Sequence, residues 1–383
     1  MHEIETPAFW VLPADSRYRR TPDRPEHLRQ EGFMEAFDAL TVVYDCIRLR
    51  ERSQAMLLAP PLKTMPGVLE SLAIEGLPSG RNLGYRVRHR DRMCEILVEV
   101  PEDDSALHVS CEAGASTLPI RANRSDQFRG RKVLYTLSKD NDFQWICDWM
   151  RFHRDVQGAD AVLLYDNGST RYAQADLLRE MRKVGGFAET LVVDWPFPYG
   201  PQGYRGRHWD SNFCQNGAME DARWRFLADA RSVLNCDIDE LVISRSGSIF
   251  ERAASAERGY VSFAGRWVLP PPETVAELPL HRDSTIAVGE EWRWANLRFK
   301  DVYRCAPKWA VAPAHCPPSS QWSVHAIYGM ASRKAPMAAT SFRHFRQIGT
   351  NWKYDRMSRE LYAKRTSIDA SLLDAFARVD WSR

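Results

Sequence analysis

Short apolar segments alternate with amphipathic segments between residues 132 and 195, and this alternation most narrows the possible folds. Three of the apolar segments are predicted strands: KVLYTL (132–137), AVLLY (161–165) and ETLVVDW (189–195). Helices are predicted between them, the second one through residues 171–184. Repeated strand–helix–strand units form an α/β fold of Rossmann-like type, in which a mainly parallel sheet has flanking helices on both faces.

The first of these helices has one apolar face. Ile146, Trp149, Met150 and His153 follow each other at helical spacing. His153 therefore reads as a packed core histidine and not as a metal ligand. Asn141 and Asp142 precede this helix and suit its N-terminal cap.

Polar side chains follow the strands at their carboxyl ends. They are Asn141 and Asp142 after the first strand, Asp166 and Asn167 after the second, and Asp237, Asp239 and Glu240 in NCDIDELV (235–242). In a parallel sheet these ends meet at one edge, where ligands bind. Crowded carboxylates repel one another unless a cation lies between them, so we expect a Mg²⁺ or Mn²⁺ site.

The segment before the acidic motif is predicted to be a helix. Its apolar positions recur every four residues, at Cys214, Ala218, Ala222 and Phe226. Its polar members are Gln215, Arg223 and Arg225. These side chains either reach the same sheet edge or face water, and the sequence leaves both alternatives open.

The first 125 residues form a predicted β-rich N-terminal domain. Ile96 and Val98 alternate with Glu95 and Glu99, as in a half-buried strand. YRVRHRDR aligns Arg86, Arg88, Arg90 and Arg92 on one face. Such a row suits phosphate or carboxylate, but a solvated edge strand uses the same pattern. With RANRSDQFRGR (121–131) as linker, we predict domains at 1–125, 126–350 and 351–383, the last a helical tail.

Charge and cysteine content exclude several classes. The chain has 52 basic and 50 acidic residues, a net charge of +2, so no bulk field favours nucleic acid or an anionic membrane. It contains no signal-peptide pattern and no apolar run of transmembrane length. Its 8 cysteines include no C-x-x-C pair, which argues against a zinc ribbon or a redox dithiol. We expect a protein of the reducing cytoplasm.

An ordered set of motifs resembles a known family. TLSKDNDFQWICDWMRFHRDVQGADAVLLYDNGST and QNGAMEDARWRFLADARSVLNCDIDELV are similar to the GT-A fold glycosyltransferases related to families 2 and 92. The resemblance runs from about Lys132 to about Ile249. It implies a metal-dependent hexosyltransferase that uses a nucleotide sugar, with uridine diphosphate favoured, and a carbohydrate or lipid-linked acceptor such as a bacterial polysaccharide.

The resemblance also implies residue roles. Asp239 would be the main metal ligand, Asp237 would bind the metal or the ribose, and Glu240 would support the strand end. Asp166, Asn167, Asn141 and Asp142 would line the nucleotide pocket. His325 would be the third metal ligand with His344 as its rival, and Lys308, Lys353 and Arg356 could bind phosphate.

An inverting transferase needs a carboxylate base that deprotonates the acceptor hydroxyl. Glu290 and Glu291 in GEEWRW are the candidates, since acids next to tryptophans suit a sugar, although the same pattern fits a solvated loop. Two other classes remain open. One is a metal-dependent phosphatase or nucleotidyltransferase, and the other is a noncatalytic glycan-binding protein.

Overall fold

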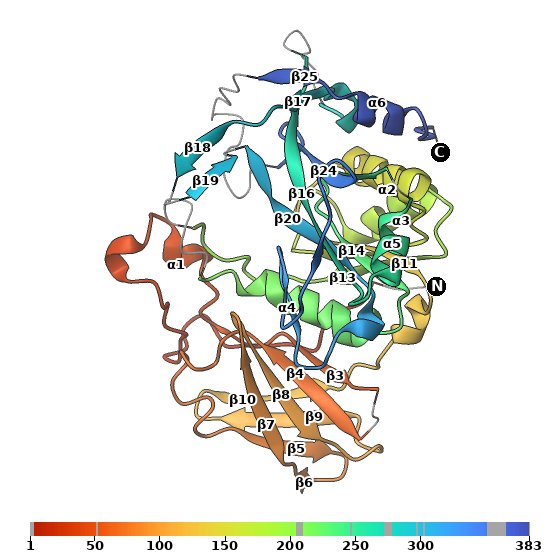
Figure 1. The fold of residues 1–383 in the computed structure, drawn as a ribbon. Coiled ribbons are helices and arrows are strands. Elements are labelled where there is room, and N and C mark those ends of the chain that lie inside the picture. The colour runs from red at the N-terminus through yellow and green to blue at the C-terminus, as the bar shows by residue number, and fades with distance from the viewer. Residues whose placement is uncertain are drawn as a thin grey trace.

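The computed structural model describes residues 4–50, 53–203, 210–245, 247–271, 278–295, 298–301, 303–350 and 365–382. Two antiparallel sheets occupy the N-terminal part, and a larger mixed sheet with helices occupies the rest (Figure 1). Of the predicted C-terminal tail, the described part holds strand β25 (Thr366–Ile368) and helix α6 (Ala370–Phe376). Lys353 and Arg356 lie outside the described residues.

Residues 41–119, which we call the N-terminal sandwich, are built from two four-stranded sheets with orders β3-β4-β8-β7 and β10-β9-β5-β6. The strands are β3 (Asp45–Arg48), β4 (Gln54–Ala59), β5 (Ala73–Leu77), β6 (Arg81–Asn82), β7 (Tyr85–Arg90), β8 (Met93–Glu99), β9 (Ala106–Cys111) and β10 (Gly114–Pro119). Strand β2 (Thr41–Val43) pairs with β1 (Trp10–Val11). Leu57, Ile96 and Val109 share the core between the two sheets.

Strand β8 is buried on both faces, which differs from the half-buried strand that its alternation predicts. Ile96 faces the sandwich core, whereas Met93 and Leu97 pack into a second core shared with the larger sheet. Glu95 lies on that second side, is fully buried, and accepts a bond from Arg90 over 3.1 Å. The alternation in the sequence identified which side of the strand carries Glu95, but it did not predict that the larger sheet and its helices cover that side.

The larger sheet has the order β13-β12-β11-β14-β20-β16-β17-β25, and β24 pairs with both β15 and β16. Its main strands are β11 (Lys132–Ser138), β12 (Ala161–Asp166), β13 (Glu189–Asp194), β14 (Ser232–Asn235), β15 (Glu240–Ser244), β16 (Tyr260–Leu269), β17 (Ile286–Val288), β20 (Arg304–Val311) and β24 (Thr340–Phe345). The short strand β23 (Arg333–Lys334) pairs with β16. Two separate two-stranded sheets are formed by β18 (Trp292–Ala295) with β19 (Arg298–Asp301) and by β21 (Gln321–Trp322) with β22 (Ile327–Tyr328).

Only part of this sheet is parallel. Strands β13, β12, β11 and β14 are parallel, as expected, whereas β20 is antiparallel to both of its neighbours, β14 and β16. Parallel neighbours need a long crossover, which helices supply between β11, β12 and β13. The described elements between β16 and β20 are short strands and one 3₁₀ turn, so the chain returns in the opposite direction. The fold is therefore mixed α/β.

Helices cover the parallel strands on both faces. Helices α2 (Phe143–Gln157), α3 (Gln174–Lys183), α5 (Ile249–Ser255) and α6 share a core with Leu134 and Val162. Helix α4 (Phe213–Asp221), the π-helical turn Ala222–Phe226 and the N-terminal sandwich cover the other face, against Val133 and Leu163. Short helical segments are α1 (Phe33–Ala36) and 3₁₀ turns at Glu26–Leu28, Ser125–Phe128, His281–Asp283 and Pro313–His315.

Helix α2 has the predicted face and cap. Asp142 is its N-cap and accepts a bond from the Gln144 N–H over 2.9 Å. His153 is fully buried, with Nδ1 2.9 Å from the Trp149 carbonyl oxygen, and its Nε2 accepts the Val242 N–H over 3.2 Å. Burial lowers the pKa of His153 to about 3, so the predicted core histidine is confirmed.

The predicted helix before the acidic motif is confirmed, but two of its arginines follow neither predicted alternative. Arg223 is buried and pairs with Glu220 over 3.1 Å, and Arg225 is buried between Asp45 and Glu5. Helix α4 lies between the large sheet and the N-terminal sandwich, so these side chains meet protein instead of water or the sheet edge.

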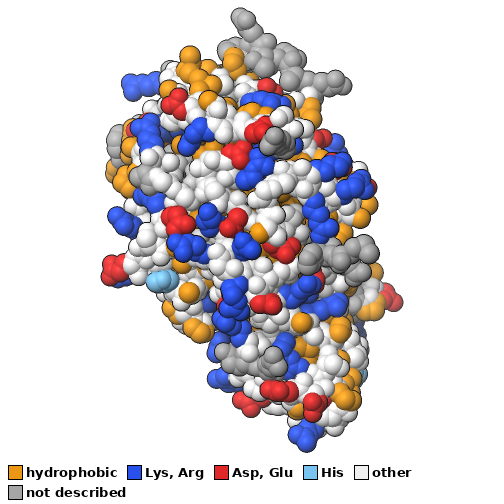
Figure 2. Space-filling model, turned by 90° about the vertical axis from the view of Figure 1, so that its right-hand side faces the viewer, with side chains coloured by type: hydrophobic (Ala, Val, Ile, Leu, Met, Phe, Trp, Pro, Cys, Tyr) orange, Lys and Arg blue, Asp and Glu red, His pale blue; other side chains and the backbone are white. Residues whose placement is uncertain are grey.

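The surface carries both signs of charge. On the face in Figure 2, Lys and Arg side chains are interspersed with Asp and Glu. All eight cysteines are free thiols. Within the described ranges, every helix is too short or too polar to span a membrane.

Candidate functional site

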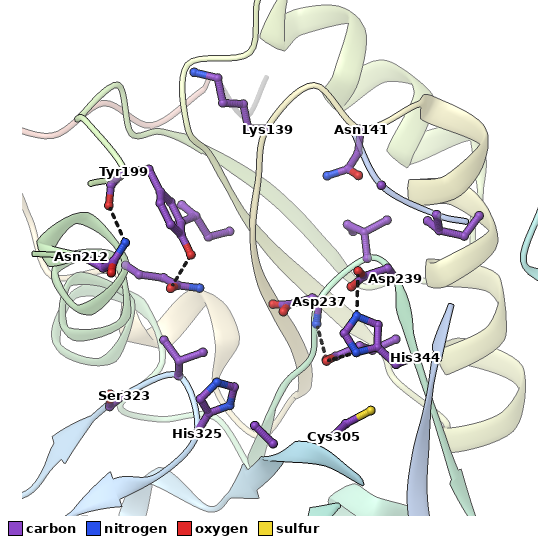
Figure 3. Close-up of a pocket in the computed structure, with 18 of the residues that line it drawn as sticks. Lys139, Asn141, Tyr199, Asn212, Asp237, Asp239, Cys305, Ser323, His325 and His344 are labelled. Carbon is purple, nitrogen blue, oxygen red and sulfur yellow. Dashed lines mark hydrogen bonds and ion pairs between the residues drawn. The ribbon is translucent and has the colours of Figure 1, made fainter. Parts of the chain in front are cut away.

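A pocket of about 650 Å³ opens beyond the carboxyl ends of β11 and β14 (Figure 3). This is the edge at which open α/β sheets bind ligands. Its polar lining includes Arg92, Lys139, Asn141, Tyr199, Asn212, Gln215, Asp237, Asp239, Glu240, Ser323, His325 and His344. The acidic motif and one of the predicted strand-end residues, Asn141, therefore meet in one cavity.

The acidic motif forms the turn between β14 and β15. Backbone bonding closes it, because the Glu240 N–H donates to the Asp237 carbonyl over 3.0 Å. The Asp237 N–H in turn donates to Glu240 Oε2 over 3.1 Å. Asp237, Asp239 and Glu240 consequently line the pocket. Glu240 is the most buried of the three, with 2% of the residue exposed.

His344 reaches this turn through strand pairing. Strand β24 is antiparallel to β15 and parallel to β16, which sets His344 next to Glu240 on one side and Trp267 on the other. The imidazole stacks on Trp267 with 4.0 Å between ring centroids. Its Nε2 lies 3.0 Å from Asp239 Oδ2 and its Nδ1 lies 3.9 Å from Glu240 Oε1.

These three side chains fit a divalent cation. Within the part of the chain that the structure describes, Asp239, Glu240 and His344 are the one group of His, Cys or acidic residues whose ligand atoms all lie within 4.8 Å of one another. Burial opposes protonation of His344, but the Asp239 carboxylate raises its pKa to about 10. A cation here would supply the positive charge that the imidazolium otherwise provides. Oxygen and imidazole ligands suit Mn²⁺ and Mg²⁺.

Lys308 of β20 forms ion pairs with two acids of the turn, Asp237 and Glu240. Its buried ammonium lies 2.7 Å from Asp237 Oδ2 and 3.2 Å from Glu240 Oε2. Burial lowers the pKa of Lys308, but the two carboxylates outweigh it and the net shift is upward. Burial raises the pKa of Glu240 to about 7. Lys308, predicted as a phosphate ligand, thus has two carboxylate partners inside the protein.

His325, the predicted third metal ligand, lines the same pocket but lies apart from the His344–Asp239 pair (Figure 3). Its Nδ1 is 3.0 Å from the Pro307 carbonyl oxygen. A carbonyl can only accept a hydrogen bond, so Nδ1 carries the proton and Nε2 is the acceptor of the neutral ring.

The predicted nucleotide-pocket residues separate into three positions. Asn141 lines the pocket, whereas Asp142 caps helix α2. Asp166 is fully buried and accepts bonds from Ser169 and Gln174, and burial raises its pKa. Asn167 donates to the Trp195 and Phe197 carbonyls over 2.8 Å each, and it lines an adjoining pocket of about 640 Å³. Lys139 and Tyr199 line both pockets.

The predicted base candidates, Glu290 and Glu291, directly precede β18 and line neither of the two pockets. Glu290 is exposed, pairs with Arg266 and accepts the Trp292 indole N–H over 3.0 Å. Glu291 pairs with Arg293. Both carboxylates therefore have local partners, which lie on β18 or on β16.

Several lining residues were not predicted. Lys139 directly follows the first strand, so the strand-end rule could have identified it. Tyr199 donates its hydroxyl to Gln215 over 2.9 Å, but its loop carries no pattern that points to a site. Arg92 belongs to the predicted arginine row, and nothing local indicates that it reaches this pocket.

The sequence model of glycosyltransferase family 92 matches residues 135–374, more than half of the chain. No curated protein matches. An apo structure of the bifunctional glycosyltransferase WbbM is similar at 11% identity and a TM-score of 0.26, over 44% of this chain and 27% of that one. The galactosyltransferase LgtC with donor and acceptor sugar analogues is similar at 18% identity and a TM-score of 0.23, over 35% and 46%. The chain thus spans less than half of either structure, and both likenesses are too slight to carry an argument.

Proposed function

The chain belongs to glycosyltransferase family 92, and on this premise we propose that it transfers a sugar from a nucleotide sugar, with uridine diphosphate as the expected nucleotide, to a carbohydrate or lipid-linked acceptor. The chain is a glycosyltransferase, so a phosphatase, a nucleotidyltransferase or a noncatalytic glycan-binding protein loses support. The fold that we propose for residues 126–350 is GT-A. The observation that carries the proposal is the grouping of Asp239, Glu240 and His344 in a pocket at the strand ends.

The donor half of the site follows from the chemistry of the leaving group. Departure of a nucleoside diphosphate develops negative charge, which a bound Mn²⁺ or Mg²⁺ would stabilise. Asp239 and His344 would hold that cation, with Glu240 as the third ligand. Lys139 and Asn141 line the pocket at the end of β11, where a phosphate and the ribose would lie. Asp237 pairs with Lys308, whose ammonium offsets part of the negative charge of the acidic turn.

Acceptor activation requires a base, and we propose His325 for this role in an inverting transfer. The acids lining the pocket among the described residues are Asp237, Asp239 and Glu240, and all belong to the cation half. His325 lines the pocket, and its bond to the Pro307 carbonyl leaves Nε2 as the basic atom. The Nε2 of a neutral imidazole can accept a hydroxyl proton. Glu290 and Glu291 remain the alternative from the sequence.

Release of uridine diphosphate from a panel of uridine-diphosphate sugars, with and without Mn²⁺, tests the donor half. We expect Mn²⁺-dependent release that falls by about 100-fold or more in Asp239→Asn, the scale on which loss of an electrostatic stabiliser acts. Asp176→Asn is the matched control, because this acid lies on the surface of α3 and pairs with Arg179. If Asp239→Asn releases the nucleotide at the wild-type rate, the pocket is not the donor site.

A further inference from the structure

The N-terminal sandwich contributes a side chain to the pocket. Strands β7 and β8 are joined by a tight turn at Asp91 and Arg92, and Arg92 lines the pocket of the larger sheet. Its backbone is left-handed, with φ of 54°, which side-chain-bearing residues seldom adopt. This conformation directs the chain so that an arginine from one layer reaches a cavity formed mostly by another.

The turn is fixed to the walls of the pocket by hydrogen bonds. The Asp91 N–H donates to Gln321 Oε1 over 2.9 Å, and the Asp91 carbonyl accepts from Gln321 and Asn216 over 2.8 and 3.0 Å. Arg90 donates to the Ser319 and Pro318 carbonyls over 2.7 and 3.0 Å. Arg92 is therefore preorganised relative to helix α4 and to the loop before β21.

The turn that carries Arg92 is bonded to the side of the pocket away from the cation group. Asn216, which holds the turn, follows the lining residue Gln215 and accepts a 3.4 Å bond from the Ser323 hydroxyl. In Figure 3, Asn212 and Ser323 lie on one side of the cavity, and Asp239 and His344 lie on the other. The donor phosphates belong next to the cation, so the Arg92 side faces the acceptor.

A guanidinium at this position favours a ligand that carries a negative charge. It presents paired N–H groups that match the oxygens of a phosphate or carboxylate. Arg92 now pairs with Asp91 Oδ2 over 3.0 Å, and its side chain is 20% exposed, so an anion can approach it from the pocket. The neighbouring lining residues on this side, Asn212 and Gln215, are uncharged.

We propose that Arg92 forms an acceptor subsite, and that the acceptor carries a phosphate or carboxylate group close to the hydroxyl that receives the sugar. The subsite rests on the proposed transfer function and adds the chemical class of the acceptor. It also gives the N-terminal sandwich a role in specificity.

The test compares acceptors that differ only in charge. Methyl glycosides of gluco, galacto and manno configuration, each in neutral, 6-carboxylate and 6-phosphate forms, are offered with the uridine-diphosphate sugar that wild type hydrolyses. We expect transfer to an anionic member to exceed transfer to its neutral partner. Arg92→Gln should reduce that preference by about 10- to 100-fold, the scale of hydrogen bonds to a charged group. Arg92→Lys should give an intermediate preference because it lacks the paired N–H groups.

Three further measurements separate the causes. Donor hydrolysis and Mn²⁺-dependent binding of uridine diphosphate should be unchanged in Arg92→Gln. Arg86 is an exposed arginine of β7, and Arg86→Gln should match wild type throughout. Weakened nucleotide binding in Arg92→Gln would assign Arg92 to the donor phosphates and overturn the subsite. Equal use of neutral and anionic members would also overturn it, with donor hydrolysis intact. A wild-type protein that hydrolyses no nucleotide sugar would overturn the proposed function itself.

Discussion

At the scale of single residues, strand pairing decides which histidine joins Asp239. His344 stands opposite Glu240 in the β15–β24 ladder and stacks on Trp267, so its imidazole has one position. His325 lies on a loop between β21 and β22 and bonds to a carbonyl. The two histidines therefore differ in their contacts although both line one pocket, and the roles proposed for them differ accordingly.

Separate asparagine substitutions test this difference. His344→Asn should weaken Mn²⁺ binding by about 10-fold or more. Replacing a residue that only orients a metal ligand already lowers metal affinity by about that factor. His325→Asn should leave Mn²⁺ affinity unchanged and reduce transfer to the acceptor. Calorimetric titration of Mn²⁺ into each variant, followed by the transfer assay, gives both readouts. The opposite pattern would support His325 as the metal ligand, as the family resemblance implies.

The sequence predicted the acids of this site better than their partners. Asp237 and Asp239 follow a strand, and the strand-end rule needs only local information. Lys308 and His344 come from strands far along the chain, and their contacts depend on antiparallel pairings that no local pattern specifies. Asp166 also follows a strand, yet Ser169 and Gln174 occupy its carboxylate inside the protein. Position at a strand end thus does not ensure access to the pocket.

At the scale of elements, periodicity predicted the strand–helix–strand region well. The predicted strands at 132–137 and 161–165 correspond to β11 and β12, and Asp142 caps α2 as proposed. The direction of the strands was predicted less well where the sheet becomes antiparallel. The residues of one strand do not determine whether its neighbour runs parallel or antiparallel to it. The prediction that one face of β8 is exposed was wrong for a related reason. Glu95 can be buried because Arg90 of the neighbouring strand β7 compensates its charge.

His153 ties helix α2 to strand β15, the strand that starts at Glu240, and predicts an acid sensitivity. Its folded pKa of about 3 lies below the ordinary value of 6.5, so the unfolded chain binds a proton that the folded protein does not. The free energy of unfolding should therefore fall, through this group, by about 1.4 kcal/mol per pH unit as the pH drops from 6.5 towards 3. No such dependence is expected from it above pH 6.5.

Urea unfolding at several pH values checks this expectation. His153→Gln should be less stable at pH 7 by about 1–3 kcal/mol, because the Val242 N–H loses its acceptor. Between pH 6 and 4.5 its stability should decline less steeply than that of wild type. Buried acids such as Asp166, whose pKa is raised, have the opposite effect on stability as the pH falls. They are the same in wild type and variant, so the difference between the two slopes reports His153 alone. Identical slopes would mean that His153 is protonated in the folded state.

At the scale of the whole molecule, the N-terminal sandwich and the larger sheet share one core. Met56 and Leu58 of β4 pack in the same cluster as Val133 and Phe226. Buried ion pairs cross this boundary, since Arg225 contacts Asp45 over 3.3 Å and Glu5 over 2.6 Å. The predicted linker 121–131 also contributes Phe128, fully buried, to this core. Composition marked a change near residue 125 but could not reveal that the two parts are packed together.

This packing predicts that the two parts unfold as one unit. Arg225→Met leaves the buried Asp45 without its guanidinium and should cost about 3–5 kcal/mol, the scale for breaking a buried pair. Hydrogen exchange measured by mass spectrometry should then show equal loss of protection in peptides from residues 41–119 and from residues 132–245. Arg231→Met is the control, because its pair with Glu251 is half exposed on both sides and its loss should leave exchange unchanged. If peptides from 41–119 keep their protection while 132–245 loses it, the sandwich is an independently stable domain that carries Arg92 to the pocket only by docking.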